Sequence, residues 1–263
     1  EISFHQLVRS SKIYDVKLEG KLSGAIGNYT DHYAAFPSID WISFAKKFVT
    51  DFGLVPNTST TQILPYDEAI DLFGNIESVN NVLIGLAEDM WHYVSDDWLL
   101  LKRGGISSVM AQKTNPEDYE RSEGALQMSN SDFSFIRWKL ATSRLQRDLS
   151  NSLATRRFGD AFGWSILGYR NLSSALGDTG TDVEEMVNAL RKHPEIISSI
   201  MQTILRTTDM ENPYERLQEL TRGRKVAIED LREFVSSLDV DGAIKERLLD
   251  LDPERSFGIA PKL

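Results

Sequence analysis

The stretch "YDEAIDLFGNIESVNNVLIGLAEDMWHYVSDDWLLL", residues 66 to 101, decides the fold because its apolar side chains recur at helical spacing. Side chains three, four and seven positions apart share one face of a helix, so this pattern predicts a long amphipathic helix. A helix of this length exceeds the globular average and favours an elongated bundle. The apolar positions on that face are Ile70, Phe73, Ile76, Leu83, Leu86 and Met90.

The same periodicity dominates the following sequence, and strand signals are scarce. We expect two further long helices, over 115–149 and 152–176, and shorter ones from the N-terminus to Gly20 and over 41–52. The fold class is therefore predicted to be all-α, a long-helix bundle followed by a small helical domain.

Gly177 marks the boundary between these two parts, because glycine commonly terminates a helix. We expect a central helical-bundle domain over residues 1–177 and a small helical domain over 178–263. The sequence is expected to begin partway along a helix of the first domain. The short helices expected in the second domain cover 182–192, 194–207, 213–221, 227–238 and 241–250.

Composition excludes several classes of function. The 263 residues carry 29 basic and 39 acidic side chains, and a net charge of −10 argues against nucleic-acid binding. The absence of cysteine excludes disulfides and thiolate metal sites, and the dispersed histidines predict no metal site. No apolar run approaches the roughly 20 residues needed to cross a membrane. We expect a cytoplasmic protein without cofactors.

The segment "ISSVMAQKTNP", residues 106 to 116, combines hydroxyls, a cation and a helix-start signal. Asn115 can cap a helix whose first position is Pro116, and that helix end adds a partial positive charge beside Lys113. These groups could hold an anionic substrate next to Ser107. The alternative is a polar turn between two helices, which the pattern alone favours.

The segment "RDLSNSLATRR", residues 147 to 157, raises a question of helix phase. Arg147 and Arg156 lie nine residues apart, so an unbroken helix would point them in opposite directions. A break within "DLSNS" could bring them together and direct backbone N–H groups at an anion. Pattern alone favours one continuous helix with solvated arginines.

Five segments in this order resemble the adenylosuccinate lyase family of the fumarase/aspartase superfamily. They are "GKLSGAIGNYTDH", "TSTTQILPYD", "ISSVMAQKTNP", "SRLQRDLSNSLATRR" and the tail "NPYERLQELTRGRKVAIEDLREFV". The resemblance covers nearly the whole chain. It implies a homotetramer whose active sites each draw on three chains. The implied reaction is anti β-elimination of fumarate from succinyl-AMP and succinyl-aminoimidazole carboxamide ribotide, two anionic nucleotides of purine biosynthesis.

Matching positions imply roles for individual residues. Ser107 resembles the catalytic base, and Arg147 resembles a substrate-binding arginine. The resemblance also favours the helix break, since the phosphate-binding pair falls just after it. The remaining substrate-binding positions are Gln62, Lys113 and Asn115 for the succinyl group and Ser152 and Arg156 for the phosphate.

Several positions depart from the family pattern, namely Tyr66, Ile106, Ala111, Gln112 and Arg121. The family's N-terminal region, which carries the general-acid histidine, has no counterpart in this sequence. We therefore expect an incomplete fragment that is inactive on its own. Two alternatives remain open: a degenerate, non-catalytic helical scaffold, and a sister lyase acting on another succinyl substrate.

Overall fold

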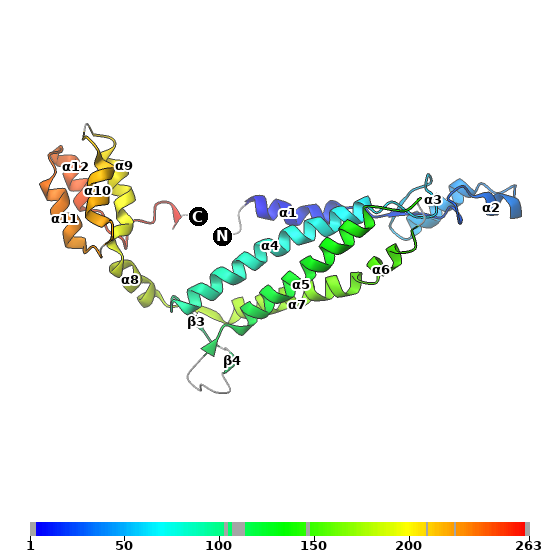
Figure 1. The fold of residues 1–263 in the computed structure, drawn as a ribbon, viewed down its shortest axis with the longest axis horizontal. Helices are drawn as coiled ribbons and strands as arrows, with labels where there is room; N and C mark the ends of the chain where they lie inside the picture. Colours follow the sequence, from blue (N-terminus) through cyan, green and yellow to red (C-terminus); the bar gives the residue numbers. More distant parts are fainter. Residues whose placement is uncertain are drawn as a thin grey trace. The chain divides into compact units, whose positions relative to one another are not determined.

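The chain forms two compact helical units in the computed structural model, which describes residues 4–102, 105–106, 114–145, 148–208, 210–223 and 225–260. The first unit runs to Ser95 and resumes at Leu101–Gly180 (Figure 1). The second comprises Asp96–Leu100 and the chain from Thr181 onward. Among the described residues, no helix is long and apolar enough to span a membrane.

Three long helices build the first unit: α4 (Asp67–Ser95), α5 (Glu117–Leu140) and α7 (Phe158–Asp178). The expected apolar faces form their contacts. Phe73, near the start of α4, stacks on Phe133, near the end of α5, at a ring distance of 5.1 Å. The α4 and α5 helices are therefore antiparallel, and α7 returns alongside α5 (Figure 1).

A polar layer crosses this bundle at mid-length. Asn80 of α4 is fully buried and donates to Asn130 Oδ1 of α5 at 2.9 Å. The Tyr169 hydroxyl of α7 donates to Asn80 Oδ1 at 2.6 Å, and the hydroxyls of Ser129 and Ser165 lie 2.6 Å apart. Each buried donor and acceptor needs its own partner, so this layer fixes the relative register of the three helices.

One helix, α1, packs along α4, and shorter elements surround the ends of the bundle (Figure 1). The β1–β2 pair is parallel and β4–β5 is antiparallel, whereas β3 pairs with β6 in a third two-stranded sheet. Strands of two or three residues contribute little core, so the fold class is all-α, as predicted. The elements are α1 (Phe4–Asp15), β1 (Glu19–Gly20), α2 (Thr30–Ala35), α3 (Trp41–Asp51), β2 (Val55–Pro56), β3 (Leu99–Leu101), β4 (Gly105–Ile106), β5 (Thr114–Asn115), α6 (Asn151–Thr155) and β6 (Thr179–Thr181).

The second unit is a cluster of short helices around an apolar core. Met201, Leu205, Leu231 and Val235 are almost completely buried at its centre. Asp182 caps the first helix by accepting from the Glu185 amide at 3.1 Å. The elements are α8 (Val183–Lys192), the 3₁₀ helix η1 (Pro194–Ile197), α9 (Ser198–Leu205), α10 (Pro213–Thr221), α11 (Ile228–Ser237) and α12 (Gly242–Leu249).

Three predicted helix ends were wrong. The first long helix ends at Ser95 instead of Leu101, and the second ends at Leu140 instead of Leu149. The N-terminal helix ends at Asp15, ahead of Gly20. The continuous helix that pattern alone favoured across 147–157 is also wrong, because the chain breaks after α5 and begins again at α6.

Candidate active site

The predicted site residues that the structure describes lie at opposite ends of the bundle. Gln62 precedes α4, and Ser152 and Arg156 follow α5, so the antiparallel packing brings all three to one end (Figure 1). Asn115 lies two residues before α5, at the other end of the bundle. The 24 residues of α5 separate the two groups by about 36 Å. One chain therefore cannot gather them around a single ligand.

Three further predicted residues, Ser107, Lys113 and Arg147, lie outside the described residues. The first two belong to the segment between β4 and β5, and the third precedes Asp148 in the sequence. Their predicted roles as base and as substrate-binding cations stay predictions.

Asn115 lies in a short strand, and this replaces its expected position as a helix cap. Its backbone pairs with Gly105, and Thr114 pairs with Ile106, so β4 and β5 form an antiparallel stem. The N-cap of α5 is Pro116, one residue later than expected, and no side chain caps the helix there. Asn115 is half-buried. Strand pairing on one side and the helix start on the other restrict where its amide can point.

Side chains from the two neighbouring helices hold the first turn of α5. Trp91 Nε1 of α4 donates to Glu120 Oε1 at 2.8 Å. The Ser174 hydroxyl of α7 donates to Asp118 Oδ2 at 3.1 Å. Sequence patterns did not identify these anchors, because each pair joins residues far apart in the chain.

Arg121, one of the departures from the family pattern, is engaged by its own helix. Its guanidinium lies 2.5 Å from Glu117 Oε1 and 3.6 Å from Asp118 Oδ1. Both carboxylates also suit the positive end of the α5 dipole. The charge of Arg121 is therefore balanced locally before any ligand arrives.

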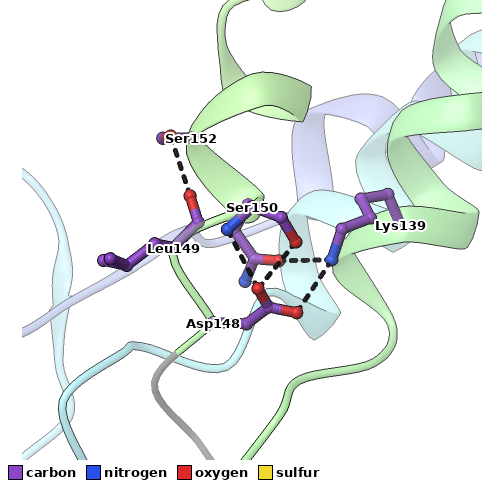
Figure 2. A network of polar contacts seen from close by, with 6 residues as sticks. Lys139, Asp148, Leu149, Ser150 and Ser152 are labelled. Atoms are coloured by element: carbon purple, nitrogen blue, oxygen red, sulfur yellow. Dashed lines mark hydrogen bonds and ion pairs between the residues drawn. The ribbon is translucent and has the colours of Figure 1, made fainter.

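At the other end of the bundle, Asp148 organises the start of α6. Its Oδ1 accepts from the Ser150 amide at 2.9 Å and from the Ser150 hydroxyl at 2.6 Å (Figure 2). Its Oδ2 accepts from Lys139 Nζ at 3.2 Å, and the same ammonium donates to Asn151 Oδ1 at 2.9 Å. The hydrogen bonds from Ser150, followed by that from Lys139, lower the pKa of Asp148 to about 2.

This arrangement corrects one expectation about the helix break. We expected the backbone amides after the break to face an external anion. The Ser150 amide instead binds the carboxylate of Asp148, and α6 has only five residues. The helix end alone therefore does not form an anion site.

The side chains of Ser152 and Arg156 are exposed one helical turn apart, on the same side of α6. The Ser152 hydroxyl donates to the Leu149 carbonyl at 2.8 Å, which leaves its lone pairs free (Figure 2). The Arg156 guanidinium makes no hydrogen bond or ion pair with any described residue. An unpaired guanidinium beside a hydroxyl suits a phosphate.

The exposed Gln62 follows a loop that is held firmly by the 20–32 segment. The Ser23 and Thr60 hydroxyls lie 2.8 Å apart, and Lys21 Nζ donates to the Thr61 carbonyl at 2.8 Å. Gly27 has a φ of +83°, and a Cβ there would lie 2.1 Å from the Thr60 carbonyl oxygen. Glycine is required at this close approach. Two of the predicted motifs therefore pack together to place Gln62.

Comparison with known proteins places the chain beside one group of enzymes. Residues 143–256 match the family model "Adenylosuccinate lyase C-terminal". Adenylosuccinate lyase of Buchnera aphidicola subsp. Schizaphis graminum is 35% identical over 255 residues, 96% of this chain and 56% of the relative. The Escherichia coli K12 adenylosuccinate lyase is 35% identical over 252 residues, 95% of this chain and 55% of the relative.

Solved structures agree on the fold. The fumarate lyase:delta crystallin from Brucella melitensis, bound to cobalt, superposes with a TM-score of 0.64 and 16% identity, over 95% of this chain and 54% of that one. The class II fumarase from Schistosoma mansoni gives a TM-score of 0.58 and 16% identity, over 78% and 43%. The chain spans about half the length of the curated relatives it matches.

Proposed function

Because the chain belongs to the adenylosuccinate lyase family of the fumarase superfamily, we propose that it forms part of a carbon–nitrogen lyase of purine biosynthesis. The proposed reaction releases fumarate from succinyl-AMP and from succinyl-aminoimidazole carboxamide ribotide, in the cytoplasm. The observation that carries the proposal is the exposed Arg156, one turn from Ser152, whose guanidinium pairs with no residue in the described part of the chain and suits the nucleotide phosphate.

The elimination makes distinct demands on the protein. A base removes the proton beside a succinyl carboxylate, the C–N bond breaks, and the leaving nitrogen receives a proton. Ser107 is the proposed base. Lys113, Asn115 and Gln62 would hold the succinyl carboxylates, where negative charge builds up in the transition state. Arg147 would add a further cation to the substrate. The general acid is not assigned to any residue of this chain.

The separation of these residues supports a shared active site. Asn115 lies about 36 Å from the end of α5 that is nearest to Gln62 and Arg156, so a second copy must bring its opposite end to the same ligand. Two antiparallel bundles side by side would satisfy this geometry. We therefore propose a homotetramer in which each site combines segments from three chains.

Glycines on the outer faces of the bundle support this assembly. Gly124 of α5 and Gly163 of α7 lie inside their helices and are exposed, and a Cβ at either would meet no described atom within 4 Å. Glycine inside a helix costs about 1 kcal/mol relative to alanine, so the single chain gives no reason for it. Trp138 is 74% exposed on the same helix as Gly124. Close packing of another copy accounts for both features.

The test is equilibrium binding of succinyl-AMP by calorimetry, comparing Arg156→Ala with Arg206→Ala. Both arginines are exposed and both cap the C-terminal end of a helix. Loss of a charged contact to phosphate should weaken binding about tenfold or more in Arg156→Ala, whereas Arg206→Ala should match the wild type. Equal affinities in both variants, or no binding by the wild type, would refute the proposed site.

One observation favours a non-catalytic helical scaffold as the alternative. Among the described residues, the start of α5 carries Glu117, Asp118 and Glu120 against one cation, Arg121, which is a poor environment for a substrate with two carboxylates. A scaffold would assemble without binding succinyl-AMP or fumarate. A sister lyase would bind a different succinyl compound, so the same titration with argininosuccinate separates the two.

A further inference from the structure

A fully buried hydroxyl group lies at the start of α5. Tyr119 is 1% exposed, and its phenolic oxygen lies 2.8 Å from Thr179 Oγ1 at the start of β6. The Thr179 hydroxyl donates its only proton to the Ala175 carbonyl, also at 2.8 Å. The hydrogen bond between the two hydroxyls must therefore run from Tyr119 to Thr179.

Burial makes this bond different from the other anchors of the same turn. The bonds to Asp118 and Glu120 are exposed to solvent, where water competes for both partners. The Tyr119 hydroxyl has no access to water, so losing its acceptor would leave an unpaired buried donor. Burial also raises the pKa of Tyr119, which keeps the phenol protonated and able to donate at neutral pH.

We infer that Tyr119 is a positioning residue, which through Thr179 fixes the first turn of α5 and thereby the place of Asn115. Tyr119 follows Asn115 by four residues, and only Pro116 separates the strand from the helix. A tilt of the first turn would therefore displace the Asn115 amide. The inference relies on the proposed function only for the role of Asn115 in binding the succinyl group, where a small misplacement is costly.

Hydrogen–deuterium exchange on the full chain tests the inference. Tyr119→Phe and Thr179→Val each remove one hydroxyl with little change in shape, whereas Thr179→Ser keeps the acceptor. In the two removal variants, the amides of residues 114, 115 and 117–119 should exchange about five- to tenfold faster, the ratio expected for one net hydrogen bond. Thr179→Ser should stay near the wild type. Residues 125–136, in the middle of α5, are the internal control and should not change.

Binding of succinyl-AMP to the same variants supplies the functional measurement. Affinity should fall about three- to tenfold in Tyr119→Phe and Thr179→Val and recover in Thr179→Ser. Unchanged exchange over 114–119, or equal acceleration along all of α5, would overturn the positioning role. A wild-type chain that binds no succinyl-AMP would refute the lyase proposal, while a local exchange response would still support the role of Tyr119 in fixing this turn.

Discussion

The two units of this chain bury different kinds of side chain. The core of the second unit is an apolar cluster around Met201, Leu205 and Leu231. Every buried polar side chain among the described residues, Asn80 and Ser129 included, lies in the first unit. Apolar burial stabilises without direction, whereas buried hydrogen bonds require one helix register. The second unit is thus stabilised by an apolar core formed from its own residues. The first unit combines a fixed helix register with exposed positions such as Gly163 and Trp138, which the proposed assembly would cover.

The largest expected effect tests the apolar core. Leu205→Ala removes a side chain that is 0% exposed, and we expect the free energy of unfolding of the second unit to fall by about 2–5 kcal/mol. Urea unfolding followed by circular dichroism measures the change. Four of the five tryptophans, Trp41, Trp91, Trp138 and Trp164, belong to the first unit, and Trp98 belongs to the second. In a Trp98→Phe background the tryptophan fluorescence transition should therefore stay in place. If both transitions move together, the two units unfold as one and the contrast between them fails.

Two glycines on α7 test whether the bundle surface is built for other copies. A Cβ at Gly168 would lie 2.6 Å from Leu126, so Gly168→Ala should destabilise the chain by about 1–3 kcal/mol. Gly163 has open space around it, so Gly163→Ala should stabilise a dissociated chain by up to about 1 kcal/mol. Urea unfolding at low protein concentration measures both changes.

The same Gly163→Ala variant should associate less, because the added methyl group would prevent close helix approach. Sedimentation velocity across a concentration series measures this shift. A variant that is more stable and assembles as well as the wild type would show that Gly163 lies outside any interface between copies.

The smallest expected effect concerns pH. The pKa of Asp148 falls from 3.8 to about 2 on folding, so its ionised form favours the folded chain. That contribution is complete above about pH 5 and is lost as pH falls from about 4 toward 2. Wild type should therefore exceed Asp148→Asn in urea midpoint at pH 6, and the gap should narrow at low pH. Asp89→Asn, at an exposed position of α4, is the control and should show no such gap.

Helical periodicity predicted the fold class and the long helices, because their apolar stripes correspond to real contacts such as Phe73 with Phe133. It failed at the end of α5. Leu145 continued the apolar spacing, but it is 86% exposed and has a φ of +52°, beyond the helix. Neither glycine nor proline marks that end. Two-residue strands such as β5 leave no periodic signal, so the pairing of Asn115 could not be predicted either.

Less of the candidate site than of the fold could be predicted from the sequence. Spacing alone favoured one continuous helix through Asp148, which was wrong, and only the resemblance favoured a break. The hydrogen bonds of Trp91 and Tyr119 join positions that are distant in the chain, which no local pattern encodes. The roles of Ser107, Lys113 and Arg147 rest on the resemblance alone.

The carboxylate of Asp148 has a consequence for ligand selectivity. This carboxylate is part of the chain and competes with external anions for the Ser150 amide, at an effective concentration on the order of millimolar or more. Free inorganic phosphate should therefore bind only weakly at the Ser150 amide at ordinary cellular concentrations. If the proposed function holds, a nucleotide that also engages Arg156 and a second copy would gain affinity that the carboxylate of Asp148 does not match. Asp148 would then disfavour simple anions relative to larger ones.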